Sequence, residues 1–243
     1  RAVEQCAALY DRDVSQFPHP ALDAEDSFFA RESKIDYGNE IFGRKYVGLM
    51  PSGKTKAMME IRSMAAMLQK AKDMDVSDKV KDKLWTLTAY YNSLKDLGKA
   101  ATMVDDDVKD FMKRMCYRLK SNVEVRKIGT ADELTSRVST TQLNQTLDKL
   151  EKNEYSTENM QKHVPPYPCN VLLATNMISV GIDVARLNVM LLVGQPKLTS
   201  EYIQASSRVG REFPGVAFTM YDGGKSRDRS HYEQFRPYHE SFY

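Results

Sequence analysis

From residue 44 onward, the chain alternates short strand-like segments with longer segments whose apolar residues recur at helical spacing. Buried strands typically appear as short apolar or alternating runs between turn-forming residues. Strand-like segments occur at residues 44–50, 85–91, 123–128, 171–174, 189–193 and 216–221. Helical patterns occur at residues 55–73, 94–115 and 139–150. This alternation predicts an α/β fold, with a mostly parallel sheet and helices on both faces.

Polar residues and prolines indicate where these elements end. Ser139 and Gln142 have the spacing of a capping box, which predicts a helix that runs to Leu150. Residues 151–169 contain a Pro-Pro pair and a further proline, so we expect an extended loop there. Residues 70–83 alternate lysine with aspartate, which is typical of a solvated connection.

The chain divides into three predicted parts. Residues 1–43 form an N-terminal extension, in which a helix end at residues 1–14 precedes a polar, proline-containing linker. Residues 44–225 form the α/β domain. Residues 226–243 are aromatic and charged, and we expect them to begin a C-terminal extension. Because the pattern stops within this aromatic stretch, we expect the sequence to be a fragment of a larger protein.

The composition is that of a globular domain and argues against a membrane protein or a disulfide-rich protein. The 243 residues are 42% hydrophobic, which supports a sizeable core, and the net charge of +2 predicts no broad cationic field. The three cysteines lie far apart, so neither a Cys-x-x-Cys metal site nor a disulfide framework is expected, and a reducing cytoplasm is the simplest location. No apolar run approaches the roughly 18 residues of a membrane span, and no signal-peptide pattern opens the chain.

Polar residues after the predicted strand at 171–174 are candidates for ligand binding. Thr175 and Asn176 stand at the C-terminal tip of that strand, where open α/β sheets bind ligands. Gly181 permits a tight turn, and Asp183 could accept hydrogen bonds from a ribose hydroxyl or hold an arginine. Such residues are suited to contact with a nucleotide or with a nucleic-acid backbone.

A second group of polar residues follows the predicted strand at 189–193. Residues 199–201 offer an N-cap and early acidic charge for a helix. Gln204, Arg208 and Arg211 then fall at positions i, i+4 and i+7, so they share one face if that helix continues. An amide and two guanidiniums on one face could orient a water molecule and neutralise charge on a transferring γ-phosphate.

These two groups carry a family resemblance. Residues 174–183, A-T-N-M-I-S-V-G-I-D, resemble motif V of the second RecA-like lobe of superfamily 2 helicases, and residues 204–211, Q-A-S-S-R-V-G-R, resemble motif VI. Residues 85–97 resemble motif IV. Over residues 44–243 the chain is most similar to the DrmA-like family of DISARM phage-defence helicases. Ala205 and Ser207 depart from the common form of motif VI, in which an arginine and a glycine are usual.

The resemblance implies a RecA-like helicase C-terminal lobe that works with a first lobe absent from this sequence. ATP and Mg²⁺ would be held mainly by that first lobe, so the chain alone is expected to be inactive. Arg208 and Arg211 would stabilise charge on the γ-phosphate, and Gln204 would position the attacking water. Gly181 and Asp183 would contact the nucleotide.

Nucleic acid is the second ligand that the resemblance implies. Its backbone would lie against the residues at the ends of two predicted strands: Asn92, Ser93, Thr175 and Asn176. DNA is favoured over RNA, and the choice between unwinding and translocation stays open. The partners implied are the first RecA-like lobe of the same protein and a further subunit of a defence complex.

Two other interpretations stay open. Residues 48–55 satisfy the phosphate-loop pattern G-x-x-x-x-G-K-[ST] between a strand and a helix, which would suit a self-contained ATPase that uses Lys54. Against it, no apolar strand ending in an acid follows, because the aspartates at 105–107 lie in a helical stretch. The chain could also serve as a docking platform, with residues 226–243 as the contact surface. His231 and His239 in that tail are expected to pack rather than bind metal.

Overall fold

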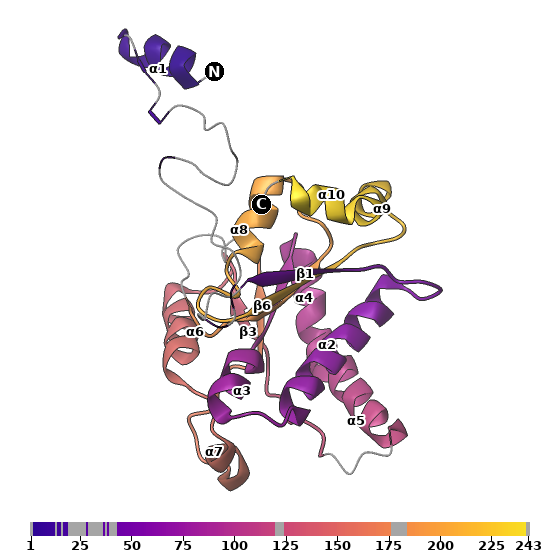
Figure 1. The fold of residues 1–243 in the computed structure, drawn as a ribbon. Helices are drawn as coiled ribbons and strands as arrows, with labels where there is room; N and C mark the ends of the chain where they lie inside the picture. Colours follow the sequence, from indigo (N-terminus) through magenta and orange to yellow (C-terminus); the bar gives the residue numbers. More distant parts are fainter. Residues whose placement is uncertain are drawn as a thin grey trace.

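A computed structural model describes residues 2–12, 14, 15, 17, 18, 28, 36, 38, 43–119, 124–175 and 184–241. Most of the predicted linker at residues 17–43 lies outside this part of the chain. The described residues form a six-stranded sheet in which every pair of neighbouring strands is parallel (Figure 1). In spatial order the strands are β1 (Arg44–Leu49), β6 (Gly215–Met220), β5 (Val189–Val193), β2 (Leu87–Tyr91), β4 (Val171–Ala174) and β3 (Asp132–Leu134).

The chain also forms helices, which except for α1 connect the strands or flank the sheet. They are α1 (Ala2–Tyr10), α2 (Lys56–Asp73), α3 (Asp78–Trp85), α4 (Leu94–Met103), the π-helical turn η2 (Val104–Val108), α5 (Lys109–Arg118), α6 (Thr140–Lys152), α7 (Thr157–Lys162), α8 (Thr199–Ser206), α9 (Ser226–Glu233) and α10 (Phe235–Glu240). The parallel sheet and its helices confirm the predicted α/β fold of RecA-like type. Within the described residues, none of the helices is long and apolar enough to cross a membrane.

Two hydrophobic clusters cover the two faces of the sheet. Along β2, Leu87, Ala89 and Tyr91 belong to the first cluster, whereas Tyr90 belongs to the second. This alternation follows from the period of two in a strand, which sends successive side chains to opposite faces. Helices α2, α4 and α5 contribute to the first cluster and α6 and α8 to the second. The sheet is thus buried on both sides, as the apolar strands predicted.

Helix α6 begins at the predicted cap, whereas α8 begins after Leu198 without the side-chain cap expected at residues 199–201. The Ser139 hydroxyl accepts from the Gln142 amide at 3.3 Å, and the Gln142 side chain accepts from the Ser139 amide, which completes the predicted capping box. Thr55 caps α2 by accepting from the Met58 amide at 3.2 Å. These caps satisfy backbone N–H groups that a helix leaves unpaired in its first turn.

Three local predictions were wrong. Residues 124–128 form no strand, because β3 pairs with β4 only at residues 132–134, after the chain has crossed the end of the sheet. The expected connection at residues 70–83 contains most of α3, which packs Trp85 into the core. The expected loop at 151–169 contains α7, which the hydroxyl of Ser156 caps. In the last two cases, tertiary contacts and a cap stabilise helices that charge and proline content disfavoured.

The C-terminal helices α9 and α10 pack against the sheet and α8 (Figure 1). His239 lies 2.8 Å through Nε2 from the Tyr202 hydroxyl, and its ring contacts Tyr46 with centroids 4.9 Å apart. Burial lowers the pKa of both His239 and His231. Among the described residues, no group of three histidine, cysteine or acidic side chains could hold a metal ion. The contacts of His239 with Tyr46 and Tyr202 attach this tail to β1 and α8.

Candidate functional site

Asn92 and Thr175 lie beside one another because their strands are neighbours. Strands β2 and β4 pair in parallel with Tyr90 opposite Ala174, so Asn92 and Thr175 follow the same end of the sheet. Thr175 is buried, and its amide donates to the Leu134 carbonyl at 3.4 Å, which ties it to β3. Carboxyl ends of parallel strands are where ligands meet an open α/β sheet. The predicted nucleic-acid residues that the structure describes thus form one group.

The Asn92 side chain holds the loop that follows β5. Its Nδ2 donates to the carbonyls of Gly194 at 3.3 Å and Gln195 at 3.4 Å. Ser93 caps α4 by accepting from the Asp96 amide at 3.1 Å, and its hydroxyl donates to the Asp96 carboxylate at 2.8 Å. Asn92 is nevertheless exposed, so a phosphate could approach it at the positive end of α4.

Gln195 belongs to this end of the sheet and was missed by sequence reasoning. It is buried, its Nε2 donates to the Tyr238 hydroxyl at 3.1 Å, and its carbonyl accepts from Arg227 as well as Asn92. The signal in the sequence was a polar side chain two residues after the apolar run of β5. Asp228, also buried, accepts from the Asp222 amide at 2.9 Å. These contacts attach the C-terminal helices to the strand ends.

The arginines predicted to share a helical face do not lie on one helix. Helix α8 ends at Ser206, and the chain then turns, with Gly210 in the left-handed region at φ +67°. The Gly210 amide donates to the Leu187 carbonyl at 3.0 Å, beside the start of β5. This contact draws the chain onto the sheet, so the expectation of a continuing helix was wrong. Gln204 and Arg211 are exposed and Arg208 is half-buried.

Arg44 holds the turn that presents Arg208 and Arg211. The Arg44 guanidinium donates through Nε to the Val209 carbonyl at 2.6 Å and through Nη2 to the Ser207 carbonyl at 3.4 Å. Arg44 is the first residue of β1, so the turn lies at the N-terminal ends of the strands. Thr175 and Asn92 lie at the opposite ends, about 16 Å away along a five-residue strand. The structure therefore separates the two groups of predicted site residues.

The segment that resembles motif V is described only up to Thr175. Asn176, Gly181 and Asp183 lie in residues 176–183, outside the described part of the chain. Their predicted contacts with nucleotide and nucleic acid stay predictions. The chain resumes at Val184, and Arg186 then forms a buried ion pair with Asp82 at 3.1 Å. This pair fixes the segment that leads into β5 against α3.

The phosphate-loop-like segment lies at the C-terminal end of β1. Gly53 has a positive φ of +64°, Lys54 is exposed, and the Thr55 hydroxyl caps α2. Helix α2 therefore begins only after Thr55. Asp222, which follows β6, lines the same hollow as residues 50–56. Sequence reasoning predicted the strand that became β6 but did not connect Asp222, two residues after its end, with this loop.

A buried carboxyl lies beneath the end of β2. The Tyr91 hydroxyl donates to Glu60 Oε1 at 2.7 Å, and both side chains are buried. Burial raises the pKa of Glu60 above its ordinary value, while the hydrogen bond from Tyr91 and the nearby Lys56 act in the opposite direction. Burial also raises the pKa of Tyr91, so its hydroxyl stays protonated and remains a donor. This pair connects α2 to the strand that leads to Asn92.

Comparison with known proteins identifies the class to which this arrangement belongs. Residues 112–212 match the family model of the helicase conserved C-terminal domain. That range contains Thr175, Gln204, Arg208 and Arg211. Residues 112–212 therefore resemble a helicase C-terminal domain, as the motifs predicted.

The chain is also similar to a DISARM protein. It is 42% identical over 243 residues to the DISARM protein DrmA of Bacillus paralicheniformis. The aligned region covers 98% of this chain and 20% of that protein. The chain thus spans about one fifth of the length of this curated relative. The predicted likeness to the DrmA-like family is confirmed.

Solved structures share the fold. The crystal structure of the DUF1998 helicase MrfA bound to DNA and AMPPNP matches with a TM-score of 0.53 and 11% identity, over 80% of this chain and 22% of that one. The structure of MrfA bound to DNA matches with a TM-score of 0.50 and 12% identity, over 82% of this chain and 22% of that one. At this level of identity the likeness concerns the fold alone.

Proposed function

We propose that this chain is the second RecA-like lobe of an ATP-dependent helicase or translocase that acts on nucleic acid in anti-phage defence. The observation that carries the proposal is the arginine turn. Arg208 and Arg211 lie inside the matched range, on a turn that Arg44 and Leu187 hold against the sheet. A rigid turn with a solvent-accessible guanidinium suits a group that must reach a phosphate on another lobe.

In this proposal the nucleotide lies between this lobe and the first. Arg208 and Arg211 would stabilise charge on the γ-phosphate, and the exposed amide of Gln204 would orient the attacking water. Gly181 and Asp183 would contact the nucleotide. ATP would supply the transferable phosphoryl group, and the Mg²⁺ that accompanies it would be held mainly by the first lobe. The residues of this chain would thus complete a site rather than form one alone.

Nucleic acid would lie at the opposite ends of the strands. Asn92 and Ser93 stand at the N-terminus of α4, whose dipole favours a phosphate. Thr175 and Asn176 follow the neighbouring strand β4. Backbone contacts of this kind position a strand without reading its sequence. We take DNA as the first ligand to test, and cytoplasm as the location.

The division of the chain follows from the same proposal. Residues 44–225 would form the lobe, residues 1–43 would link it to what precedes, and residues 226–243 would begin an extension that rests on it. A further subunit of the defence complex would bind the full-length protein. The whole protein's activity and partners are proposals, because the chain spans about one fifth of its curated relative.

The arginine turn provides the direct test. Arg208→Ala and Arg211→Ala in the full-length protein should each lower nucleic-acid-stimulated ATP hydrolysis by about 10³-fold or more, since arginine fingers contribute 10³ to 10⁵ in turnover. Lysine should rescue poorly because a point charge cannot reproduce the planar fork. Arg236→Ala is the control, because the Arg236 side chain is 87% exposed on α10. Turnover within a few-fold of wild type in both alanine variants would refute the proposed role.

A second test separates a helicase from a docking platform. Thr175→Val removes the hydroxyl of a buried side chain without opening a cavity, and circular dichroism checks that the variant is folded. Single-strand affinity should fall with little dependence on sequence, because the contact is to the backbone. Unchanged affinity, together with loss of a partner protein on Tyr232→Ser at the exposed surface of α9, would favour the platform.

ATP hydrolysis by the 243-residue chain alone tests the phosphate-loop alternative. A self-contained ATPase predicts robust turnover by the 243-residue chain that Lys54→Ala abolishes. The two-lobe proposal predicts no turnover by that chain, because the groups that hold Mg²⁺ would belong to the other lobe. Equal, low hydrolysis by the chain and its Lys54→Ala variant supports the two-lobe proposal.

A further inference from the structure

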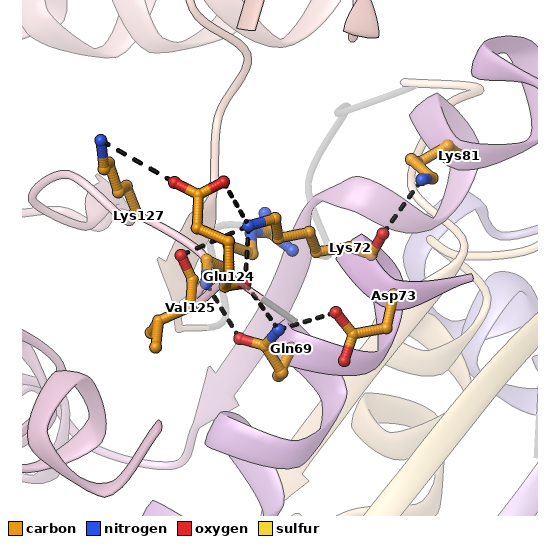
Figure 2. A network of polar contacts seen from close by, with 8 residues as sticks. Gln69, Lys72, Asp73, Lys81, Glu124, Val125 and Lys127 are labelled. Carbon is orange, nitrogen blue, oxygen red and sulfur yellow. Dashed lines mark hydrogen bonds and ion pairs between the residues drawn. The ribbon is translucent and has the colours of Figure 1, made fainter. Parts of the chain in front are cut away.

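A cavity of about 760 Å³ opens at the N-terminal ends of β2 and β4. Trp85 lies two residues before the first of these strands and Asn170 directly before the second, and both line the cavity. Its other walls come from α3, α7 and the segment at residues 124–130, part of which Figure 2 shows. Asn92 and Thr175 lie at the other ends of the same strands. The cavity is therefore distinct from the proposed nucleic-acid contacts.

Positive charge is concentrated around this cavity. The cations among its lining residues are Lys72, Lys81, Arg126, Lys127 and Lys149. The lining contains one carboxylate, Glu124, whereas the entire 243-residue chain has a net charge of only +2. In Figure 2, Glu124 lies between Lys72, 3.2 Å away, and Lys127, 4.0 Å away. Lys149 also pairs with Asp132, which lies 2.6 Å away and outside the lining. The cations still outnumber these two carboxylates, so the cavity favours an anion.

Arg126 contributes a buried charge that no carboxylate in the described residues balances. The side chain is 3% exposed, and its guanidinium donates to the Leu68 and Trp85 carbonyls at 3.0 and 2.8 Å and to Asn170 Oδ1 at 2.9 Å. Neutral oxygens satisfy these hydrogen bonds without cancelling the charge. Burial of an unbalanced cation is costly, so an anion in the adjoining cavity would be stabilised by it.

Aromatic rings form another wall of the cavity. Trp85 and Tyr155 lie with ring centroids 4.2 Å apart, and the Arg126 guanidinium lies 3.6 Å from the Trp85 ring centroid. Within the described residues, the Trp85 indole nitrogen and Arg126 Nε have no hydrogen-bond partner although both side chains are buried. Tyr167, 41% exposed, stands at the rim and donates to the His163 carbonyl at 2.7 Å. Trp85 and Tyr155 are buried against one another, so Tyr167 is the ring in this wall whose exposed face could stack with an aromatic ring of a ligand.

We propose that this cavity binds a nucleotide, either free or at the end of a nucleic-acid strand. The cationic lining selects phosphate, and the aromatic wall selects a planar base. Its volume is within the roughly 300–1,000 Å³ of small-molecule sites. The proposal does not depend on the helicase assignment, because it uses neither the arginine turn nor the C-terminal ends of the strands.

Charge variants of the 243-residue chain test the site. Isothermal titration calorimetry with AMP should show saturable binding with a Kd below about 1 mM. Lys127→Glu should weaken it about fivefold or more, and Glu124→Gln should tighten it roughly threefold, because a lost or gained charge near a phosphate changes its energy in opposite directions. These opposite signs separate an electrostatic effect from general damage to the fold.

Lys113→Glu is the matched control. Lys127 is 74% exposed with its acidic partner three residues away, and Lys113 is 68% exposed with Asp110 three residues away. Lys113 lies on α5, outside the cavity. Both variants therefore lose a similar surface ion pair, but only the first should weaken AMP binding. Circular dichroism checks that each variant is folded.

Other outcomes overturn the proposal or name the source of the nucleotide. Absence of AMP binding below about 1 mM, or equal losses in Lys127→Glu and Lys113→Glu, excludes the site. Inorganic phosphate that binds as tightly as AMP, with no loss in Tyr167→Ala, excludes recognition of a base. A 5′-phosphorylated hexanucleotide that binds more tightly than AMP, and weakens in Lys127→Glu, assigns the cavity to a strand end. Tighter binding of AMP assigns it to the free nucleotide.

Discussion

Gly210 offers a test of how the arginine turn is built. Its φ of +67° lies in the left-handed region, where an L side chain costs roughly 1–2 kcal/mol. A Cβ at this position would also lie 2.7 Å from Gly215 Cα and 2.9 Å from Gly215 N. Both are backbone atoms of β6, which cannot rotate away. Gly210→Ala should therefore cause backbone strain and a steric clash at once.

Gly53 separates these two effects. Its φ is +64°, nearly that of Gly210, but an added Cβ would meet nothing within 4 Å. Gly53→Ala should thus cost only the backbone term, about 1 kcal/mol. Overpacking of a well-filled site typically costs a further 1–3 kcal/mol, so Gly210→Ala should lower the free energy of unfolding by about 2–4 kcal/mol. The entropy that alanine removes from the unfolded chain is the same in both variants and cancels.

Urea unfolding of the 243-residue chain, followed by circular dichroism, measures both free energies. The slope against urea should stay constant, because neither change alters the surface exposed on unfolding. A Gly210→Ala variant that unfolds within about 0.5 kcal/mol of Gly53→Ala would refute the packing of the turn against β6. In the full-length protein, Gly210→Ala should also lower ATP hydrolysis, because Gly210 lies between Arg208 and Arg211.

Two further predictions concern buried carboxyls. Asp82→Asn should lower the free energy of unfolding by about 3 kcal/mol, because it removes the buried ion-pair partner of Arg186 and leaves only the exposed Glu154, 3.6 Å away. Asp148→Asn, in an exposed pair, should cost under about 1 kcal/mol, and equal losses in urea unfolding would contradict this. Glu60 has a raised pKa in the fold, so its contribution to stability is present at acid pH and is lost as pH rises through the raised pKa. Glu60→Gln, which keeps an acceptor for Tyr91, should therefore gain stability relative to wild type from about pH 4.5 upward, and parallel pH profiles would show that Glu60 titrates normally.

Local sequence determined the elements and the motifs that they carry. Apolar runs located β4 and β5 within a residue, because a strand buried on both faces must be apolar throughout. Ser139 with Gln142 located the start of α6, because a capping box uses only residues three apart. Asn92 and Thr175 could be placed at strand ends because each follows an apolar run that predicts a strand. Each inference needed only information contained within a few neighbouring positions.

Only the tertiary structure decided which of these pieces meet. The order of the strands brings Asn92 beside Thr175 and places the arginine turn at the opposite ends, although motifs V and VI are close in sequence. Helix α8 stops at Ser206 because the Gly210 amide bonds to Leu187 instead of continuing the helical pattern, a contact that helical spacing could not reveal. The cationic cavity likewise assembles residues from distant segments, such as Lys72 and Lys149. Local sequence cannot determine such contacts, because they depend on how separate elements pack around a shared sheet.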